Sequence, residues 1–189
     1  METKTHVCPA WVGKLMISPL RKLIHSPEKM LSDYIRSGMN ILEIGPGMGY
    51  FTLPLARITG EKGTVYAVDI QQNMLRTLKL RAEKADLGDR IITRTCTADS
   101  FNIADLENRV DFCLLFAVVH EVGNQEILFE QVFQTLKPGG SVYLAEPRGH
   151  VSYQNWSKSL EIAQEKGLIP ITDPSVKRCF GKILIKKLK

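Results

Sequence analysis

The sequence lacks three features that would each assign the chain to a particular class of protein. No apolar run approaches the ~18 residues that a membrane-spanning helix needs, and the first residues do not begin a signal peptide. The four cysteines are scattered and form no C-x-x-C motif, which favours a reduced protein over a disulfide framework. We therefore predict a cytoplasmic location.

Metal donors and excess charge are also scarce. His6 and Cys8 lie close together but have no second donor pair, so we expect no metal site. The net charge is only +5, and four lysines among the last eight residues supply much of it, which favours a solubility feature over a nucleic-acid footprint. The length of 189 residues suits one domain, with room for a short appendage.

The sequence does contain a regular alternation of predicted strands and helices. We predict strands at residues 40–44, 64–68, 90–95, 110–116 and 141–145. We predict helices at residues 27–35, 51–58, 72–85, 125–136 and 152–166. Such alternation indicates a mainly parallel sheet with helices on both faces.

The tail breaks this alternation. Residues 175–180 and 182–188 are predicted to be two strands hinged near Gly181, and strands so close in sequence can pair only antiparallel. We therefore predict an α/β fold with a Rossmann-like, doubly wound sheet of seven strands, mostly parallel, with an antiparallel C-terminal hairpin. A plain dinucleotide-binding fold, whose sheet is parallel throughout, lacks such a hairpin.

A glycine-rich turn follows the first predicted strand. Gly45, Gly47 and Gly49 are spaced G-x-G-x-G, and Glu43 stands two residues before the first of them. Glycine allows a positive φ and the close approach of a ligand, while the next helix points free N–H groups at the turn. The dinucleotide fingerprint G-x-G-x-x-G needs a third glycine where Tyr50 stands, and the P-loop pattern is missing, so the spacing argues against both.

Acidic residues follow the next two predicted strands. Asp69 ends the second strand, and its carboxylate can accept hydrogen bonds from both ribose hydroxyls of an adenosine; a solvated strand-end aspartate is the alternative. Asp99 follows the third strand and can accept from the exocyclic amine of adenine. Because the carboxyl ends of parallel strands meet in one crevice, we expect these groups and the glycine turn to form one site.

Four motifs occur in a fixed order: Glu43-Ile44-Gly45-Pro46-Gly47-Met48-Gly49, Val65-Tyr66-Ala67-Val68-Asp69, Ala98-Asp99 and Leu136-Lys137-Pro138-Gly139-Gly140. In them the chain resembles class I S-adenosylmethionine-dependent methyltransferases, especially the small, single-domain type 11 group related to quinone-biosynthesis methyltransferases. The resemblance covers residues 39–189 and implies that they form a class I methyltransferase domain. It implies S-adenosyl-L-methionine as cofactor and S-adenosyl-L-homocysteine as product.

The resemblance also implies roles for individual residues. Gly45 and Gly47 would lie beneath the methionine part of the cofactor, and Glu43 would orient the turn. Ile70 would pack on the adenine, and Phe116 would line the methionine and sulfonium side. The implied cofactor contacts are Glu43, Gly45, Pro46, Gly47, Gly49, Asp69, Ile70, Met74, Ala98, Asp99 and Phe116.

Residues 1–38 precede the first predicted strand and are expected to form a helical lid segment. In enzymes of the resembling family such a segment folds over the cofactor and completes the substrate pocket. Trp11, Met16 and His25 are candidates to line that pocket, with plain apolar packing as the alternative.

Polar residues after the fourth predicted strand are candidates for catalysis. The enzyme aligns nucleophile and methyl group, and it needs a general base only if the nucleophile loses a proton. His120 is the candidate base; the alternative is that it orients the loop, and Glu121 is expected to face solvent or to start the next helix. His150 and Arg148, after the fifth strand, are second choices for substrate contact.

The acceptor is predicted to be a small molecule that is methylated at oxygen, carbon or sulfur. Amino methyltransferases carry an Asn/Asp-Pro-Pro-aromatic motif after the fourth strand, and residues 116–119 contain no proline, which argues against an exocyclic base amine. The alternatives are an RNA methyltransferase, a module that binds S-adenosylmethionine without catalysis, and, least favoured, a dehydrogenase. Neither the acceptor nor the oligomeric state follows from the sequence.

Overall fold

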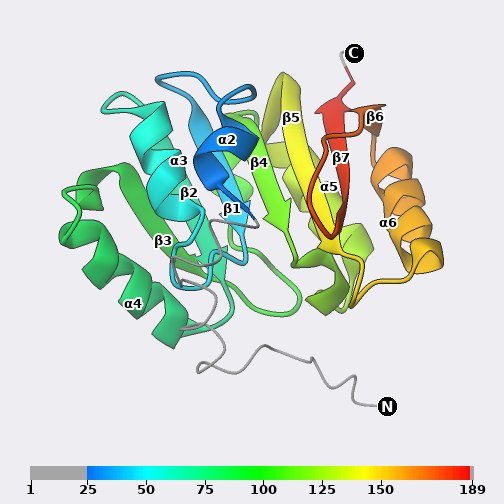
Figure 1. The fold of residues 1–189 in the computed structure, drawn as a ribbon, viewed down its shortest axis with the longest axis horizontal. Coiled ribbons are helices and arrows are strands. Elements are labelled where there is room, and N and C mark those ends of the chain that lie inside the picture. The colour runs from blue at the N-terminus through cyan, green and yellow to red at the C-terminus, as the bar shows by residue number, and fades with distance from the viewer. Residues whose placement is uncertain (1–24, 188–189) are drawn as a thin grey trace. The chain divides into compact units, whose positions relative to one another are not determined.

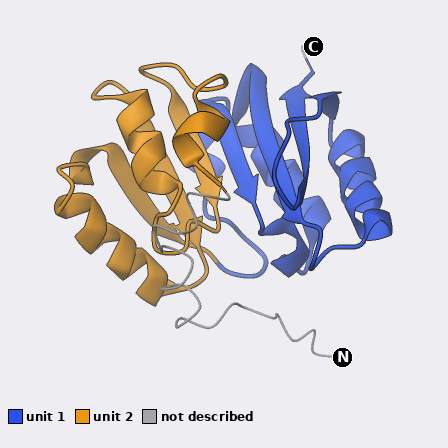
Figure 2. Ribbon diagram, viewed as in Figure 1, with its two compact units in different colours: residues 1–7, 97–189 blue, residues 8–96 orange. Residues whose placement is uncertain are grey.

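The computed structural model of the chain describes residues 25–187. Within them the chain forms two compact units, residues 25–96 and residues 97–187 (Figure 2). The sequence candidates His6, Cys8, Trp11 and Met16 lie outside the described residues. In the described part of the chain, no helix has the length and apolar character needed to cross a membrane.

The unit of residues 25–96 is built around three parallel strands. β2 (Thr64–Asp69) lies between β1 (Asn40–Ile44) and β3 (Ile91–Thr95) (Figure 1). The helices of the unit are α2 (Pro27–Leu31), α3 (Thr52–Thr59), α4 (Gln72–Glu83) and the 3₁₀ helix η2 (Gly88–Arg90). α4 packs on β2 and β3 because its buried residues recur at helical spacing, namely Met74, Leu75, Leu78 and Ala82.

The unit of residues 97–187 combines a parallel and an antiparallel pair. β4 (Val110–Phe116) runs parallel to β5 (Leu136–Pro147), and β7 (Cys179–Lys186) pairs antiparallel with both β5 and β6 (Leu168–Thr172). Its helices are η3 (Ala104–Leu106), η4 (Val119–Glu121), α5 (Gln125–Thr135) and α6 (Tyr153–Glu165). The Asn124 and Ser152 side chains cap α5 and α6 by accepting from Ile127 N (3.1 Å) and Asn155 N (3.2 Å).

The predicted fold class is confirmed. The described residues contain seven strands, three in a parallel sheet in residues 25–96 and four in a mixed sheet in residues 97–187, and helices pack on the strands of each unit. The pairings within each unit are parallel from β1 to β5, and the antiparallel hairpin is at the C-terminal end. The strands predicted at residues 40–44 and 110–116 have the observed bounds, because both are predominantly apolar segments that become buried on both faces.

The hinge predicted at Gly181 is wrong. The hairpin is formed by β6 and β7, and Gly181 lies inside β7 opposite Ala145 of β5. A Cβ atom at Gly181 would lie 2.8 Å from the carbonyl oxygen of Pro174 and 3.0 Å from Cγ2 of Val176. Glycine is needed here because the loop before β7 passes close to the strand. A close approach of another backbone segment, like a turn or a bend, is a common reason for glycine in a β-strand.

Two other predicted bounds also need correction. The helix predicted over residues 27–35 ends at Leu31, and the Nη1 of Arg36 donates to the carbonyls of Ser32 (3.2 Å) and Asp33 (3.1 Å), which satisfies them outside a helix. The strand predicted at residues 141–145 begins earlier, at Leu136. Residues 137–140, predicted as a stop signal, form the irregular start of β5, where its register with β4 shifts.

Substitution of Gly181 tests this packing. We predict that Gly181→Ala lowers the free energy of unfolding by about 1–3 kcal/mol, since the new methyl group would overlap the loop before β7. Urea unfolding measures the change. Gly123→Ala is the matched control, because a Cβ there would meet no atom within 4 Å, and it should change stability by less than about 0.5 kcal/mol. Equal losses in the two variants would contradict the packing role.

Candidate functional site

The turn between β1 and α3 is held in a conformation that requires glycine. Gly45, Gly47 and Gly49 have φ angles of 72°, 52° and 85°, in the left-handed region that other residues avoid. The Gly45 N–H donates to the carbonyl of Val68 (2.9 Å), and the Gly49 N–H donates to the carbonyl of Pro46 (2.9 Å). The turn is therefore anchored to β2 at its start and closed on itself.

Gly47 and Gly49 have different surroundings. A Cβ atom at Gly47 would meet no atom of residues 25–187 within 4 Å, so among the described residues the backbone there borders open space. A Cβ at Gly49 would overlap Leu78 of α4 and lie 2.7 Å from Cδ1 of Leu53 in α3. Gly49 therefore has a packing reason to be glycine, whereas the open side of Gly47 fits a bound group that approaches the backbone closely.

Asp69 links the end of β2 to the glycine turn. Its Oδ2 accepts from the Gly47 N–H (3.2 Å) and its Oδ1 accepts from the Gln71 N–H (2.8 Å). The residue is 8% exposed, and this burial raises the pKa of its carboxyl group while the backbone N–H bonds oppose the rise. The Ile70 N–H also contributes a backbone hydrogen bond to this carboxyl group. A carboxylate has about four acceptor positions, so these bonds still leave acceptor capacity for a ligand.

Two further side chains stabilise the turn. Glu43, 3% exposed, accepts a hydrogen bond from the Thr52 hydroxyl (2.6 Å), which ties β1 to the first residue of α3. Arg81 of α4 donates from its guanidinium to the carbonyl of Met48, and burial lowers the pKa of this arginine. Arg81 was not predictable from the sequence, because its contact with Met48 joins residues 33 positions apart and follows no local pattern.

The residues around Asp69 give this corner an apolar surface. Ile70 is 42% exposed although it is a large apolar side chain, whereas Met74, in the first turn of α4, is buried. Cys96 donates its backbone N–H to the carbonyl of Asp69 (3.1 Å). The pKa of the Cys96 thiol is raised to about 11, mainly by burial and to a smaller extent by the negative charge of nearby Asp69. This thiol is protonated at neutral pH and therefore is not a nucleophile.

The second unit carries the remaining predicted cofactor contacts. Ala98 and Asp99 are exposed in the turn after β3, which is closed by a hydrogen bond from Thr97 N to the carbonyl of Ser100 (2.9 Å). Phe116 is 9% exposed at the end of β4. Ala98 and Asp99 follow a strand and Phe116 ends one, as predicted, and their role as cofactor contacts stays a prediction.

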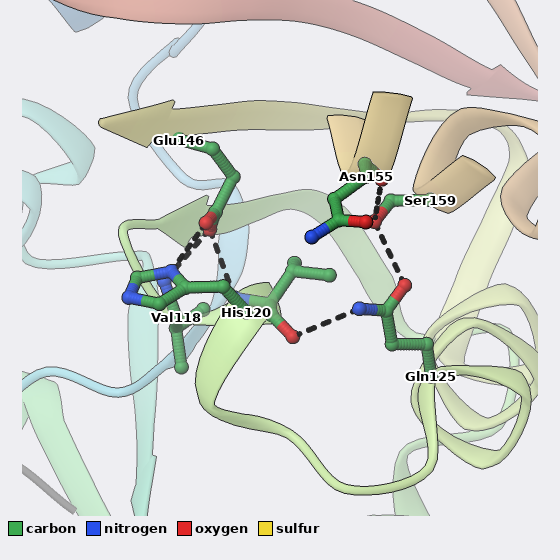
Figure 3. A network of polar contacts seen from close by, with 7 residues as sticks. Val118, His120, Gln125, Glu146, Asn155 and Ser159 are labelled. Carbon is green, nitrogen blue, oxygen red and sulfur yellow. Dashed lines mark hydrogen bonds and ion pairs between the residues drawn. The ribbon is translucent and has the colours of Figure 1, made fainter. Parts of the chain in front are cut away.

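The loop after β4 is held by a buried carboxyl group. Ala117 has a φ of 55°, a left-handed conformation that is costly for a residue with a Cβ. This turn brings the N–H groups of Val118 and Val119 to Oε1 of Glu146, each at 2.9 Å. Oε2 of the same carboxyl group contacts Nδ1 of His120 (Figure 3). Glu146 stands near the end of β5 and is 2% exposed.

A second set of hydrogen bonds holds the opposite side of this loop. Gln125, at the start of α5, donates its Nε2 to the carbonyl of Val119 (3.2 Å). Its Oε1 accepts from the Ser159 hydroxyl of α6 (2.8 Å), which also donates to the carbonyl of Asn155 (3.0 Å) (Figure 3). The loop that presents His120 is thus fixed by side chains from β5 and α5, and α6 supports the second of them.

The other polar residues predicted near His120 differ in their placement. The ring of His150 lies 5.9 Å from that of His120, centroid to centroid, at 87°. Arg148 is turned toward β7: its Nε donates to the carbonyl of Cys179 (3.0 Å) and its guanidinium lies 4.8 Å over the ring of Phe180. Of the two, the structure therefore brings only His150 next to the candidate base.

Sequence reasoning missed Glu146 as a functional residue. Two signals were present, because a glutamate at the end of an otherwise apolar strand is costly to bury without partners, and His120 needed a neighbour to orient it. The partner was not predictable, since the two residues are 26 positions apart.

The two glycines allow a test of these assignments. We predict that Gly49→Ala lowers the free energy of unfolding by about 2–4 kcal/mol, because a left-handed φ and an overlap with two leucines combine. Gly47→Ala should lose only about 1–2 kcal/mol, the conformational part alone. Urea unfolding of both variants measures the difference, and a loss at Gly47 as large as at Gly49 would disagree with the open space beside Gly47.

Comparison with known proteins identifies the family. A family profile described as "Methyltransferase domain" matches residues 35–181. A ubiquinone/menaquinone biosynthesis C-methyltransferase of Azotobacter vinelandii is 30% identical over 112 residues, which are 59% of this chain and 44% of that protein. The mitochondrial ubiquinone biosynthesis O-methyltransferase of Bos taurus is 31% identical over 121 residues, 64% of this chain and 30% of that protein. The matched regions thus span less than half the length of these relatives.

The fold has a close counterpart among solved structures. The crystal structure of a SAM dependent methyltransferase from Aquifex aeolicus superimposes with a TM-score of 0.85 at 23% identity, over 95% of this chain and 100% of that one. At this identity the likeness shows the fold alone. Together with the profile match, which covers most of the chain, it confirms the resemblance drawn from the sequence motifs. The chain belongs to the methyltransferase domain family, and over part of its length it is similar to methyltransferases of quinone biosynthesis.

Proposed function

We propose that the chain is an S-adenosylmethionine-dependent methyltransferase that transfers a methyl group to an oxygen, carbon or sulfur atom of a small molecule. One observation carries the proposal. The strand-end carboxylate of Asp69 binds the Gly47 N–H at the open side of a glycine turn, and it keeps acceptor positions for the hydroxyls of a ribose.

We assign the cofactor contacts as the sequence predicts them. Gly45, Pro46 and Gly47 hold the methionine part, with Glu43 and Thr52 supporting the turn from below. Asp69 takes the ribose hydroxyls. Ile70 and Met74 supply an apolar surface for the adenine, and the exposed Ile70 is the part of that surface that a ring can cover. Gly49, Ala98, Asp99 and Phe116 complete the proposed set.

The bound cofactor supplies a methyl group on a positively charged sulfur, which is a good leaving group. The chain's own residues then have to bind, orient and exclude water, which is the main part of catalysis in methyl transfer. Backbone N–H groups and buried carboxyl groups do this without moving, because the turn and the loop after β4 are already fixed by hydrogen bonds.

The acceptor is proposed to be a small molecule. The relatives that support this include one named as a C-methyltransferase and one named as an O-methyltransferase, both in quinone biosynthesis. Because their names differ in the atom that is methylated, similarity does not select between carbon and oxygen. Residues 1–38 as a lid and a cytoplasmic location are further parts of this proposal.

Methyl transfer from labelled cofactor tests the proposal. The purified chain is incubated with S-adenosylmethionine carrying a tritiated methyl group and, in separate reactions, with small-molecule and RNA fractions of a cell extract. We expect label in the small-molecule fraction. Label in RNA alone would replace the proposal with an RNA methyltransferase, and binding of S-adenosylhomocysteine without any labelled product would reduce it to a cofactor-binding module.

The role of Asp69 has its own test. We predict that Asp69→Asn weakens S-adenosylhomocysteine binding by about 1–3 kcal/mol, or roughly 5- to 150-fold in Kd, because charged hydrogen bonds to the ribose are lost. Isothermal titration calorimetry measures the affinity. Asp89→Asn, the same change at an exposed aspartate of η2, is the control and should leave Kd unchanged. An unaltered Kd in Asp69→Asn would identify Asp69 as a structural residue only.

A further inference from the structure

We propose that Glu146 is a positioning residue that makes Nε2 of His120 the proton acceptor for methyl transfer, and that the acceptor therefore loses a proton when it is methylated. The inference rests on the proposed function. It adds to that function a named base, the residue that orients the base, and a chemical restriction on the substrate. All the residues concerned belong to the unit of residues 97–187.

The contact with Glu146 determines which ring nitrogen of His120 carries the proton. Nδ1 of His120 contacts Oε2 of Glu146, whose other oxygen already accepts two backbone N–H groups. A carboxylate oxygen accepts hydrogen bonds, so Nδ1 is the nitrogen that carries the proton. In the neutral ring this leaves the lone pair on Nε2, the nitrogen directed away from the carboxyl group (Figure 3).

The His120 ring and the backbone before it are both held by hydrogen bonds. The His120 side chain is 23% exposed, so its ring has access to a bound molecule, whereas the Glu146 side chain is 2% exposed. Glu146 is bound to the backbone of the two residues that precede His120. Gln125 holds the carbonyl of Val119 from the opposite side. A ring held through both its side chain and its backbone keeps one orientation, as a base must.

The surroundings of His120 favour the positive charge that its ring acquires when it takes up a proton. The hydrogen bond to Glu146 raises the pKa of His120; burial lowers it, and the charges of Glu146 and Glu121 raise it further. The net rise means that the imidazolium formed by proton uptake is stabilised where it forms. The groups that face the ring are Glu146 from β5, Glu121 from its own 3₁₀ helix, and the perpendicular ring of His150.

These steps define the reaction. As the acceptor atom forms its bond to the methyl carbon, its own proton passes to Nε2 of His120, and the electron pair of the broken carbon–sulfur bond stays on sulfur. The positive charge thus moves from the sulfonium to the imidazolium, and the atoms and charges balance. Glu146 stays hydrogen-bonded to Nδ1 and stabilises the charged ring.

This reaction restricts the class of acceptor. A hydroxyl, a thiol or an acidic carbon carries the proton that the step needs. A thioether or a tertiary amine carries none on its nucleophilic atom, so a base would serve no purpose. The inference therefore assigns the acceptor to the first group and excludes the second.

Nuclear magnetic resonance of the imidazole nitrogens tests the inference directly. In the ¹⁵N-labelled protein, long-range proton–nitrogen correlations report which ring nitrogen is protonated, and a pH titration reports the pKa of each ring. His120→Gln identifies the His120 signals among the four histidines. We expect the neutral His120 ring to be protonated at Nδ1, with a pKa above the ordinary histidine value. A neutral ring protonated at Nε2 would overturn the inference without any further variant.

Glu146→Gln is the decisive substitution. The amide oxygen can still accept from Val118 and Val119, but the amide nitrogen now donates to Nδ1, so the neutral ring must carry its proton on Nε2. We expect reversal of the tautomer and a titration midpoint lower by about 1 pH unit or more. Methyl transfer into the small-molecule extract should fall by about 10²-fold, as for loss of a general base. Transfer that stays at the wild-type level despite the reversed tautomer would overturn the inference.

Two further measurements distinguish loss of the Glu146–His120 contact from a general charge effect and from loss of cofactor binding. Glu121→Gln makes the same chemical change beside His120 without a hydrogen bond to Nδ1, and it should shift the titration slightly and leave the tautomer as it is. Calorimetry with S-adenosylhomocysteine tests the proposed function separately. We expect Glu146→Gln to bind it with the wild-type Kd; absence of binding by the wild-type chain itself would defeat the proposed function while leaving the tautomer result valid.

Discussion

Both candidate loops depend on the same interaction, a hydrogen bond from backbone N–H groups to a buried carboxyl group at the end of a strand. Asp69, at the end of β2, receives the Gly47 N–H from the turn that follows β1. Glu146, near the end of β5, receives the N–H groups of Val118 and Val119 from the loop that follows β4. The device occurs once in each unit and in each case joins neighbouring parallel strands. It fixes the glycine turn and the segment that leads into the short 3₁₀ helix η4.

This interaction explains why strained backbone persists in both places. Gly47 has a φ of 52° and Ala117 a φ of 55°. The first is free of steric cost because glycine has no Cβ, whereas the second costs on the order of 1–2 kcal/mol. Two charge-assisted bonds from Glu146 are of the size needed to offset that cost. The strain at Ala117 is therefore a consequence of aiming two consecutive N–H groups at one carboxyl oxygen.

Much of the fold was predictable from the sequence, and the reason lies in local signals. Predominantly apolar segments mark β1 and β4, glycine spacing marks the turn at residues 45–49, and Asp69 follows the apolar part of β2. Contacts between distant residues leave no such signal. Arg81 with Met48 and His120 with Glu146 are separated by 33 and 26 positions. At Gly181 a local signal was present but was misinterpreted. A glycine in a strand region fits either a turn or the close approach of another segment, and only the position of the neighbouring loop distinguishes the two.

Under the proposed function, the difference between the two anchored loops matches the two tasks of a methyltransferase, which are to bind the cofactor and to bind the methyl acceptor. The loop at Gly47 presents bare backbone to open space, which suits a cofactor that is the same in every turnover and is recognised by its ribose and amino-acid groups. The loop at Ala117 presents side chains, among them His120, and side chains are what substitution can vary to suit a particular acceptor. Because each loop has its own carboxylate anchor, such variation in the loop that carries His120 leaves the anchor of the glycine turn intact.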